Sequence, residues 1–292
     1  MEGNIDLKAL NRAFTDSFSH LFDTDPHQLT KNDMEPAVLE EIWTIKNPLS
    51  HEEAAKILKH TQDLGYNIAP VTTSSGPVLM PEWRDNKRCM IDDAKSADII
   101  WQRVKDTVPK AILGWTPVGL NTRFRFYQYV VGNYFNQHVD GCYAKSRDEQ
   151  SFITFQIYLN EGMKGGSTTF FDNIFEGGQW ECVPKIGKGV FFYHRGWLHE
   201  GSAVTEGIKY TIRSDIMYRK LSQAELKEME KTLNDHCNVC EEDVKISTGK
   251  CGHKILSCCC DYQCMPDPTT KVKERRSDRY CAECHRRTEV QQ

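Results

Sequence analysis

Six short β-type segments between residues 121 and 218 constrain the fold of this chain more than any other feature. Many short strands with turn residues between them are typical of a β-sandwich or a closed barrel, whose interior can hold a ligand. Gly, Asn and Asp separate the segments, which are RFRFYQYVV, SFITFQIYLN, GSTTFFD, QWECVP, KGVFFYHR and KYTIRSDIMY.

Two helices are expected ahead of the β segments. In the first, PLSHEEAAKILKHTQDLGY, Ser50 and Glu53 have the spacing of a capping box, and apolar residues follow at helical intervals. The second is DDAKSADIIWQRVKDTVP, which ends before Pro109. We expect EIWTIKN to form a strand and residues 70–92, rich in Pro, Ser, Thr and Asp, to form a loop. Both helices should cover a sheet, so the expected class is α+β: a double-stranded β-helix (jelly roll) backed by helices.

The cysteines mark a boundary near residue 237. Of the 12 cysteines, only Cys89, Cys142 and Cys182 precede that residue. The start MEGNIDLKALNRAF has neither the basic nor the apolar part of a secretion signal, and no apolar run reaches the roughly 18 residues that cross a bilayer. We therefore expect a cytoplasmic or nuclear protein, in which clustered thiols are better interpreted as metal ligands than as disulfides.

Four parts follow from these features. LSQAELKEMEKTL, with a capping box at Ser222 and Glu225, is expected to be a helix that leads into the Cys-rich tail. The expected parts are an N-terminal lead-in of one or two loose helices (1–45), a main domain (46–220) with its jelly-roll core at 121–218, a linker helix (221–236) and a small zinc-binding module (237–292).

The formal net charge of −4 identifies no partner. It gives no general attraction to nucleic acid or to anionic lipid, so no membrane association is expected, while a local nucleic-acid surface stays open. The oligomeric state is not encoded in any feature of the sequence.

The stretch NQHVDG places His138 and Asp140 two residues apart at the end of a β segment. On an extended chain this spacing directs both side chains to the same face. Iron in oxygenases is commonly held by two histidines and one carboxylate on one face, which makes the pair a candidate half-site. His199, where GVFFYHRGWLHEGSAV turns into the next strand, is the candidate third ligand, whereas His194 is interpreted as the polar end of a strand.

Two alternating segments predict a polar cavity beside this site. In GIKYTIRSDIMY one face carries Lys209, Thr211, Arg213 and Asp215. In SFITFQIYL one face carries Thr154, Gln156 and Tyr158. A metal, a cation and hydroxyl groups in one cavity suit a chelating acid whose far end is a second carboxylate.

The order of five motifs resembles the prolyl 4-hydroxylase-like branch of the 2-oxoglutarate and iron(II)-dependent dioxygenases. The resemblance spans roughly residues 121–218. The motifs are YxYxxGxxFxxHxD (127–140), IYLN (157–160), GGxTxF (165–170), PxxGxxxxF (184–192), and His199 with Lys209 ten residues later.

The resemblance implies an enzyme in which His138, Asp140 and His199 hold Fe(II). 2-Oxoglutarate and O2 would be co-substrates and ascorbate a supporting reductant; the products would be succinate, CO2 and a hydroxylated C–H position. By the family pattern Lys209 binds the far carboxylate of 2-oxoglutarate, Tyr158 assists it, and Tyr129 lies near the iron end. Arg213 is the alternative anchor; Asn121, Arg123 and Arg125 are either substrate contacts or a solvated strand edge.

The tail resembles a RING-type cross-brace, in which eight Cys or His ligands bind two zinc ions. It departs from that pattern at its centre, where a CCC run and a three-residue gap replace a simple CxxC, so ligand pairing and ubiquitin-ligase activity stay open. The candidate zinc ligands are Cys237, Cys240, Cys251, His253, Cys258, Cys260, Cys264, Cys281 and Cys284.

Three functions are compatible with the sequence. The leading one is a hydroxylase of a protein side chain, prolyl by resemblance. The second keeps this chemistry on a small molecule or a nucleobase. The third is a zinc-dependent adaptor whose β domain binds without catalysis.

Overall fold

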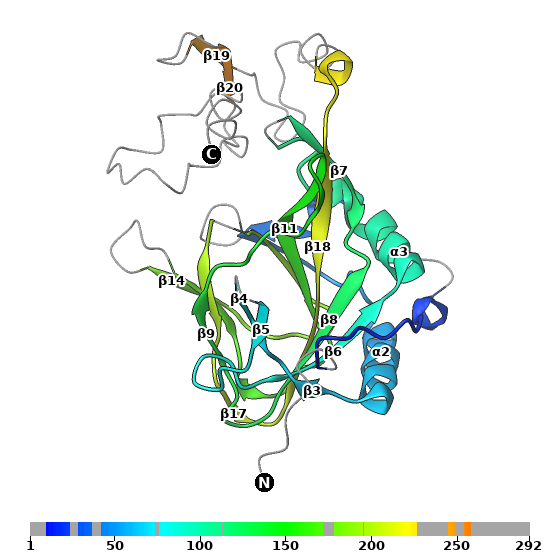
Figure 1. The fold of residues 1–292 in the computed structure, drawn as a ribbon, viewed down its shortest axis with the longest axis vertical. Coiled ribbons are helices and arrows are strands. Elements are labelled where there is room, and N and C mark those ends of the chain that lie inside the picture. The colour runs from blue at the N-terminus through cyan, green and yellow to red at the C-terminus, as the bar shows by residue number, and fades with distance from the viewer. Residues whose placement is uncertain are drawn as a thin grey trace. The chain divides into compact units, whose positions relative to one another are not determined.

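β-Strands account for most of the secondary structure in the computed structural model (Figure 1). The structure describes residues 10–23, 29–36, 42–73, 76–112, 114–171, 178–194, 196–226, 245–248 and 254–257. The chain divides into a first unit (1–107, 119–143 and 151–217) and a second unit (108–118, 144–150 and 218–292).

The first unit is built on a large sheet. Strands β18 (Lys209–Lys220), β8 (Arg123–Tyr129) and β6 (Lys87–Asp92) lie side by side in antiparallel register within it. The order across this sheet is β1 (Met34–Pro36), β2 (Ile42–Ile45), β15 (Gly189–Tyr193), β11 (Glu149–Tyr158), β18 (Lys209–Lys220), β8 (Arg123–Tyr129), β6 (Lys87–Asp92) and β3 (Asn67–Ile68).

A second sheet of the same unit faces the large one. Its order is β14 (Gln179–Cys182), β13 (Thr168–Phe171), β16 (Leu198–Gly201) and β9 (Phe135–His138). Residues of both sheets line a single cavity, so the sheets meet face to face around it. Two sheets that face each other, with few helices, are the arrangement expected of a jelly roll. Two small pairs complete the unit, β4 (Val71–Thr73) with β5 (Gly76–Val78) and β12 (Lys164–Gly165) with β17 (Val204–Glu206).

The alternation of β11 separates an apolar face from a polar one. Ile153, Phe155 and Ile157 are buried, and the Phe155 ring stacks on Phe191 with centroids 4.1 Å apart. Phe155 and Ile157 line a small void together with Ile100 of helix α3 (Ala94–Val104), so this face packs toward the helices. Gln156, on the opposite face, lines the cavity between the sheets. The predicted period of two is therefore confirmed.

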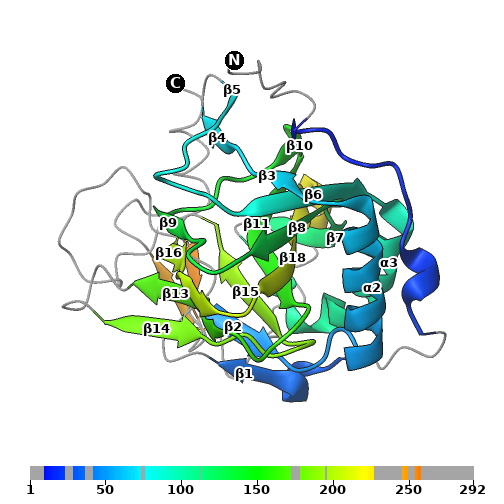
Figure 2. The same cartoon turned by 90° about the horizontal axis from the view of Figure 1, so that it is seen from below.

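Two helices lie on one side of the large sheet, α2 (His51–Leu64) and α3 (Ala94–Val104) (Figures 1 and 2). The predicted capping box at the start of α2 is present: Glu53 N donates to Ser50 Oγ at 3.1 Å, and Ser50 N donates to Glu53 Oε2 at 2.8 Å. The short 3-10 helices are η1 (Ser19–Leu21), η2 (Lys31–Asp33) and η3 (Lys105–Thr107). Both predicted helices and the strand β2 are confirmed.

A buried ion pair joins the two helices. Arg103 of α3 donates to both carboxylate oxygens of Glu53, each at 2.7 Å, and the side chains are only 5% and 1% exposed. Glu53→Ala leaves the guanidinium buried without its carboxylate, which typically costs about 3–5 kcal/mol. We expect a fall of this size in the free energy of unfolding, measured by urea denaturation. The control is Glu52→Ala, which removes only an exposed pair with Lys56 and should change stability little.

Two expectations about local structure are wrong. Residues 70–92 are not a loop, because they contain the strands β4, β5 and β6. Every residue of β6 pairs with β8. The described N-terminal residues 10–23 are not loosely attached either. Phe18 is fully buried with its ring 5.0 Å from that of Phe124, and Phe14 N donates to Met90 O at 2.7 Å. Burial of this aromatic residue anchors a segment whose own pattern is weak.

The second unit contains β7 (Trp115–Leu120), β10 (Ala144–Ser146), the end of β18, and a hairpin of β19 (Lys245–Thr248) and β20 (Lys254–Ser257). The predicted capping box after β18 is present, since Glu225 N donates to Ser222 Oγ at 3.2 Å and Ser222 N to Glu225 Oε2 at 2.8 Å. The nine candidate zinc ligands, Cys237 to Cys284, lie outside the described residues. None of the described helices is long and apolar enough to span a membrane.

Candidate functional site

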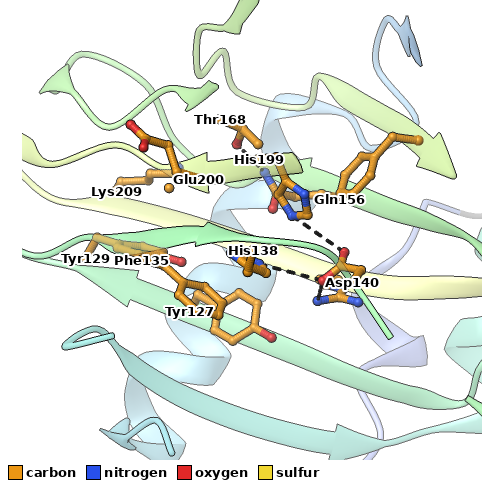
Figure 3. Close-up of a pocket in the computed structure, with 13 residues that line it drawn as sticks. Tyr127, Tyr129, Phe135, His138, Asp140, Gln156, Thr168, His199, Glu200 and Lys209 are labelled. Atoms are coloured by element: carbon orange, nitrogen blue, oxygen red, sulfur yellow. Dashed lines mark hydrogen bonds and ion pairs between the residues drawn. The ribbon is translucent and has the colours of Figure 1, made fainter. Parts of the chain in front are cut away.

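Strands β9 and β16 bring the three candidate iron ligands together (Figure 3). His138 and His199 are direct cross-strand partners, with ring centroids 4.3 Å apart. Asp140 follows two residues after His138, and its two oxygens lie 3.7 Å from His138 Nε2 and from His199 Nε2. One ligand atom from each residue lies within 4.8 Å of the others, the only such group among the described residues.

Backbone contacts orient both histidines for metal binding. His138 Nδ1 lies 2.7 Å from the carbonyl oxygen of Asn136, and His199 Nδ1 lies 3.1 Å from that of Trp197. A carbonyl oxygen only accepts, so each Nδ1 carries the proton and each Nε2 presents a lone pair toward Asp140. Burial lowers the pKa of His199 and lowers that of His138 to about 3, so both rings are neutral at pH 7.

Asp140 is held as a carboxylate by two donors. Thr154 Oγ1 donates to Oδ2 and Arg213 Nη1 donates to Oδ1, both at 2.7 Å. Burial opposes ionisation, but the charge of Arg213 outweighs it and holds the pKa of Asp140 well below its usual range. Two neutral imidazoles and one carboxylate on one face fit Fe(II), and the hydrogen bonds behind them fix the ligand geometry.

Arg213 belongs to a buried polar network and not to the co-substrate end of the cavity. Its second contact is Asp215 Oδ1 at 3.3 Å, and Asp215 Oδ2 in turn accepts from Arg125 and from Asn121, each at 3.3 Å. Asn121 and Arg125 are therefore structural partners of Asp215. Arg123 pairs with Asp92 at 2.7 Å and is partly exposed, as expected for a strand edge.

Lys209 lies at the other end of the cavity. Its side chain is 2% exposed and forms no ion pair with any residue that the structure describes. The ammonium lies 5.0 Å from the centre of the Tyr129 ring and 5.7 Å from that of Tyr158. Burial lowers the pKa of Lys209 to about 7. A cation buried without a counter-charge is suited to an anionic ligand, which would restore its charge.

Gly166 makes room for this lysine. Its φ of +71° lies in the left-handed region that favours glycine, and a Cβ would lie 3.3 Å from Lys209 Cδ and 3.1 Å from Val204 Cγ2. The second glycine of the GGxTxF segment is therefore explained by the close approach of the lysine stem, whereas a Cβ on the first, Gly165, would lie 2.3 Å from the Ala203 carbonyl oxygen.

The tyrosines lie differently from the expectation. Tyr129 is not at the iron end: it is the cross-strand partner of Lys209 and lies beside it in Figure 3. Tyr158 is fully buried and does not line the cavity. Its hydroxyl contacts Thr168 Oγ1 at 2.8 Å and donates to the Cys182 carbonyl at 3.1 Å. Tyr158 thus supports Thr168, whose hydroxyl faces the cavity.

The cavity connects the iron ligands with Lys209 and encloses about 380 Å³, space open to solvent included. Gln156 was expected in it, but Thr168, Glu200 and Phe135 were not recognised. Thr168 is the T of GGxT and accepts from Gln156 Nε2 at 2.9 Å, so the cross-strand register could have identified it. The lining residues are Tyr127, Tyr129, Phe135, His138, Asp140, Gln156, Thr168, Phe192, His199, Glu200, Gly201, Lys209 and Arg213.

Comparison with known proteins gives a class that agrees with the His-Asp-His site. Residues 124–214 match the sequence profile of the 2OG-Fe(II) oxygenase superfamily, and this segment contains all three candidate iron ligands and Lys209. The match, together with the His-Asp-His site, supports an oxygenase enzyme.

One relative in sequence is a provisionally named prolyl 4-hydroxylase of Acanthamoeba polyphaga mimivirus, 30% identical over 112 residues. The alignment covers 32% of this chain and 44% of the viral protein, so the chain spans less than half the length of that relative.

Two similar solved structures are distant. A Pseudomonas putida prolyl-4-hydroxylase has a TM-score of 0.44 and 16% identity, over 62% of this chain and 94% of that one. A Trichoplax adhaerens prolyl hydroxylase, in complex with a hypoxia inducible factor peptide, has a TM-score of 0.45 and 15% identity, over 67% and 87%.

Proposed function

We propose that this protein is a 2-oxoglutarate- and Fe(II)-dependent dioxygenase that hydroxylates a C–H bond of a protein side chain, a prolyl residue in the first instance. The observation that carries the proposal is one cavity with two matched ends. At one end lie two neutral imidazoles and a carboxylate, and at the other lies a buried lysine that pairs with no carboxylate in the described part of the chain.

The iron, when bound, supplies the oxidising chemistry, which the protein side chains alone do not have. His138 Nε2, His199 Nε2 and Asp140 would hold the metal. Lys209 would bind the far carboxylate of 2-oxoglutarate through a charge-assisted hydrogen bond. Burial of these groups excludes bulk water and strengthens each contact.

A direct assay tests the reaction. The purified chain is incubated with Fe(II), 2-oxoglutarate, ascorbate and proline-containing peptides, and succinate and peptide mass are measured. The proposal requires succinate and CO2 together with a gain of one oxygen atom in the peptide. Succinate without peptide oxidation would retain the co-substrate assignment and reject the prolyl substrate. No succinate under any metal or peptide condition would reject the enzyme.

We propose in addition that residues 237–292 form a structural module with about two zinc ions, since each tetrahedral site takes four Cys or His ligands. The clustered cysteines and the expected cytoplasmic or nuclear location support it. Metal analysis of the full chain should give about two zinc ions per protein. A chelator should release them and leave the domain that carries His138, Asp140 and His199 folded. A full-length protein without zinc would contradict the module.

A further inference from the structure

A group of buried donors lies next to the iron end of the cavity; we call Arg84, Arg88, Tyr127 and Thr211 the arginine cluster. Arg88 is the cross-strand partner of Tyr127, and Tyr127 is that of Thr211. The Arg84 guanidinium lies 4.8 Å from the centre of the Tyr127 ring and 4.4 Å from that of Phe135. Both rings line the cavity, as Figure 3 shows for Tyr127 and Phe135.

Phe135 connects the cluster to the metal ligands. Its ring stacks on His138 with centroids 3.7 Å apart, and its backbone pairs with that of Arg84. The segment before Arg84 is tied to β9 as well, because Asn136 N donates to Trp83 O at 2.9 Å. Arg84 is therefore held in place beside the strand that carries His138.

The cluster contains polar atoms for which the described residues offer no hydrogen-bond partner. Arg84 Nη2, Arg88 Nε and Thr211 Oγ1 are buried and have no hydrogen-bond partner among the described residues. Arg84 and Arg88 are only 6% and 7% exposed. Leaving a buried donor unpaired typically costs about 1–3 kcal/mol, so such atoms are usually explained by a missing partner.

The two arginines also have no counter-charge within the described part of the chain. Arg84 Nε donates to Asn86 Oδ1 at 2.6 Å, and Arg88 Nη2 donates to Asn11 Oδ1 at 2.7 Å, both neutral amides. Arg103, in contrast, has its own carboxylate. Although burial favours the neutral phenol, Arg84 and its neighbours lower the pKa of Tyr127, which reflects a positive potential at this point.

We propose that the arginine cluster binds a carboxylate side chain of the protein substrate, an Asp or Glu close to the residue that is hydroxylated. A guanidinium pairs with a carboxylate through two parallel hydrogen bonds, which would satisfy Arg84 Nη2 and neutralise its charge. The inference rests on the proposed function and adds the chemistry of the substrate to it.

The position of the two arginines separates them from the co-substrate. Arg88 lies on β6, two strands from β18, which carries Lys209, and neighbouring strands are about 4.8 Å apart. A 2-oxoglutarate held between Lys209 and the metal therefore leaves Arg84 and Arg88 for another ligand. Trp83 and Val139, 40% and 47% exposed, precede Arg84 and follow His138, so apolar surface is available near both for the substrate chain.

The test compares two fluorescent peptides of equal length, one with repeating Pro-Glu units and one with repeating Pro-Gln units. Binding to the full chain is measured by fluorescence anisotropy at fixed salt, with 2-oxoglutarate and with Mn(II), which suits the same nitrogen and oxygen ligands. We expect the acidic peptide to bind about tenfold tighter, the effect of one charge-assisted hydrogen bond. The wild-type comparison needs no variant and is decisive if a variant fails to fold.

Arg84→Gln should remove most of this preference, while Arg84→Lys should retain part of it. The matched control is Arg123→Gln, which removes the same charge from a partly exposed arginine paired with Asp92 and should keep the preference. Equal binding of the two peptides to the wild type, or no binding of either, would overturn the inference. An equal loss of the preference for the acidic peptide in Arg123→Gln would also overturn it. The same holds if Arg84→Gln raises the concentration of 2-oxoglutarate that is required but keeps the preference for the acidic peptide. Failure of the proposed function is a separate result: absence of succinate with Fe(II), whichever peptide binds.

Discussion

Alanine in place of His138, Asp140 or His199 should abolish succinate production, because the three side chains supply every protein ligand of the proposed iron site. Loss of a residue that only supports a ligand typically costs 10–100-fold, so loss of a ligand should cost more than about 100-fold. Succinate and bound iron are measured on the same preparations, and both should fall together.

The matched control for these variants is His51→Ala, since His51 is an exposed histidine at the start of α2, outside the cavity. It should keep succinate production. Thermal unfolding of each variant separates loss of metal from loss of fold. Near-normal succinate in any two of the three ligand variants would show that the metal, or the reaction, lies elsewhere.

The local pattern of the sequence was sufficient for the parts of the fold that depend on alternation and capping. His138 and Asp140 share a face because they are two residues apart, and this holds for any extended strand. Both capping boxes, Ser50 with Glu53 and Ser222 with Glu225, depend only on residues three apart. These features need no knowledge of what packs against them.

Pairing between distant segments could not be predicted from alternation and capping. The strand β6 follows a segment rich in Pro, Ser and Thr, and only its pairing with β8 makes it a strand of the large sheet. Phe18 packs in the core through Phe124, more than a hundred residues later in the sequence. Propensity is a weak predictor wherever such tertiary contacts decide the structure.

In the candidate site, too, the local pattern was sufficient for some features, whereas others depended on long-range pairing. Alternation places Lys209 and Arg213 on one face of β18, but it cannot tell which partner each cation meets. The partner of Arg213 is Asp140, 73 residues earlier, whereas no carboxylate among the described residues pairs with Lys209. The register of β8 likewise places Tyr129 opposite Lys209. Pairings between strands distant in sequence determined both outcomes.

Lys209 and Arg213 should therefore respond differently to substitution. Lys209→Met removes the buried ammonium but keeps much of the side-chain volume, so packing around Gly166 is preserved. A charge-assisted hydrogen bond is worth about 1.5–3 kcal/mol, and its loss should raise the 2-oxoglutarate concentration needed for half-maximal succinate by about one to two powers of ten. The affinity for iron should change little, because Lys209 contacts none of the three ligands.

Arg213→Met should give the opposite result. Its guanidinium donates to Asp140 Oδ1 at 2.7 Å and is the strongest of the charges that keep Asp140 ionised. Without it the carboxylate is buried with fewer donors, and the partner of a metal ligand typically contributes 10–100-fold to metal affinity. The Fe(II) concentration for half-maximal activity should rise by about this factor, while the 2-oxoglutarate requirement at saturating iron stays close to that of the wild type.

Titrating Fe(II) and 2-oxoglutarate against each variant separates the roles of Lys209 and Arg213. A 2-oxoglutarate defect in Arg213→Met with none in Lys209→Met would place the anchor at Arg213 and reverse the assignment of the two ends of the cavity.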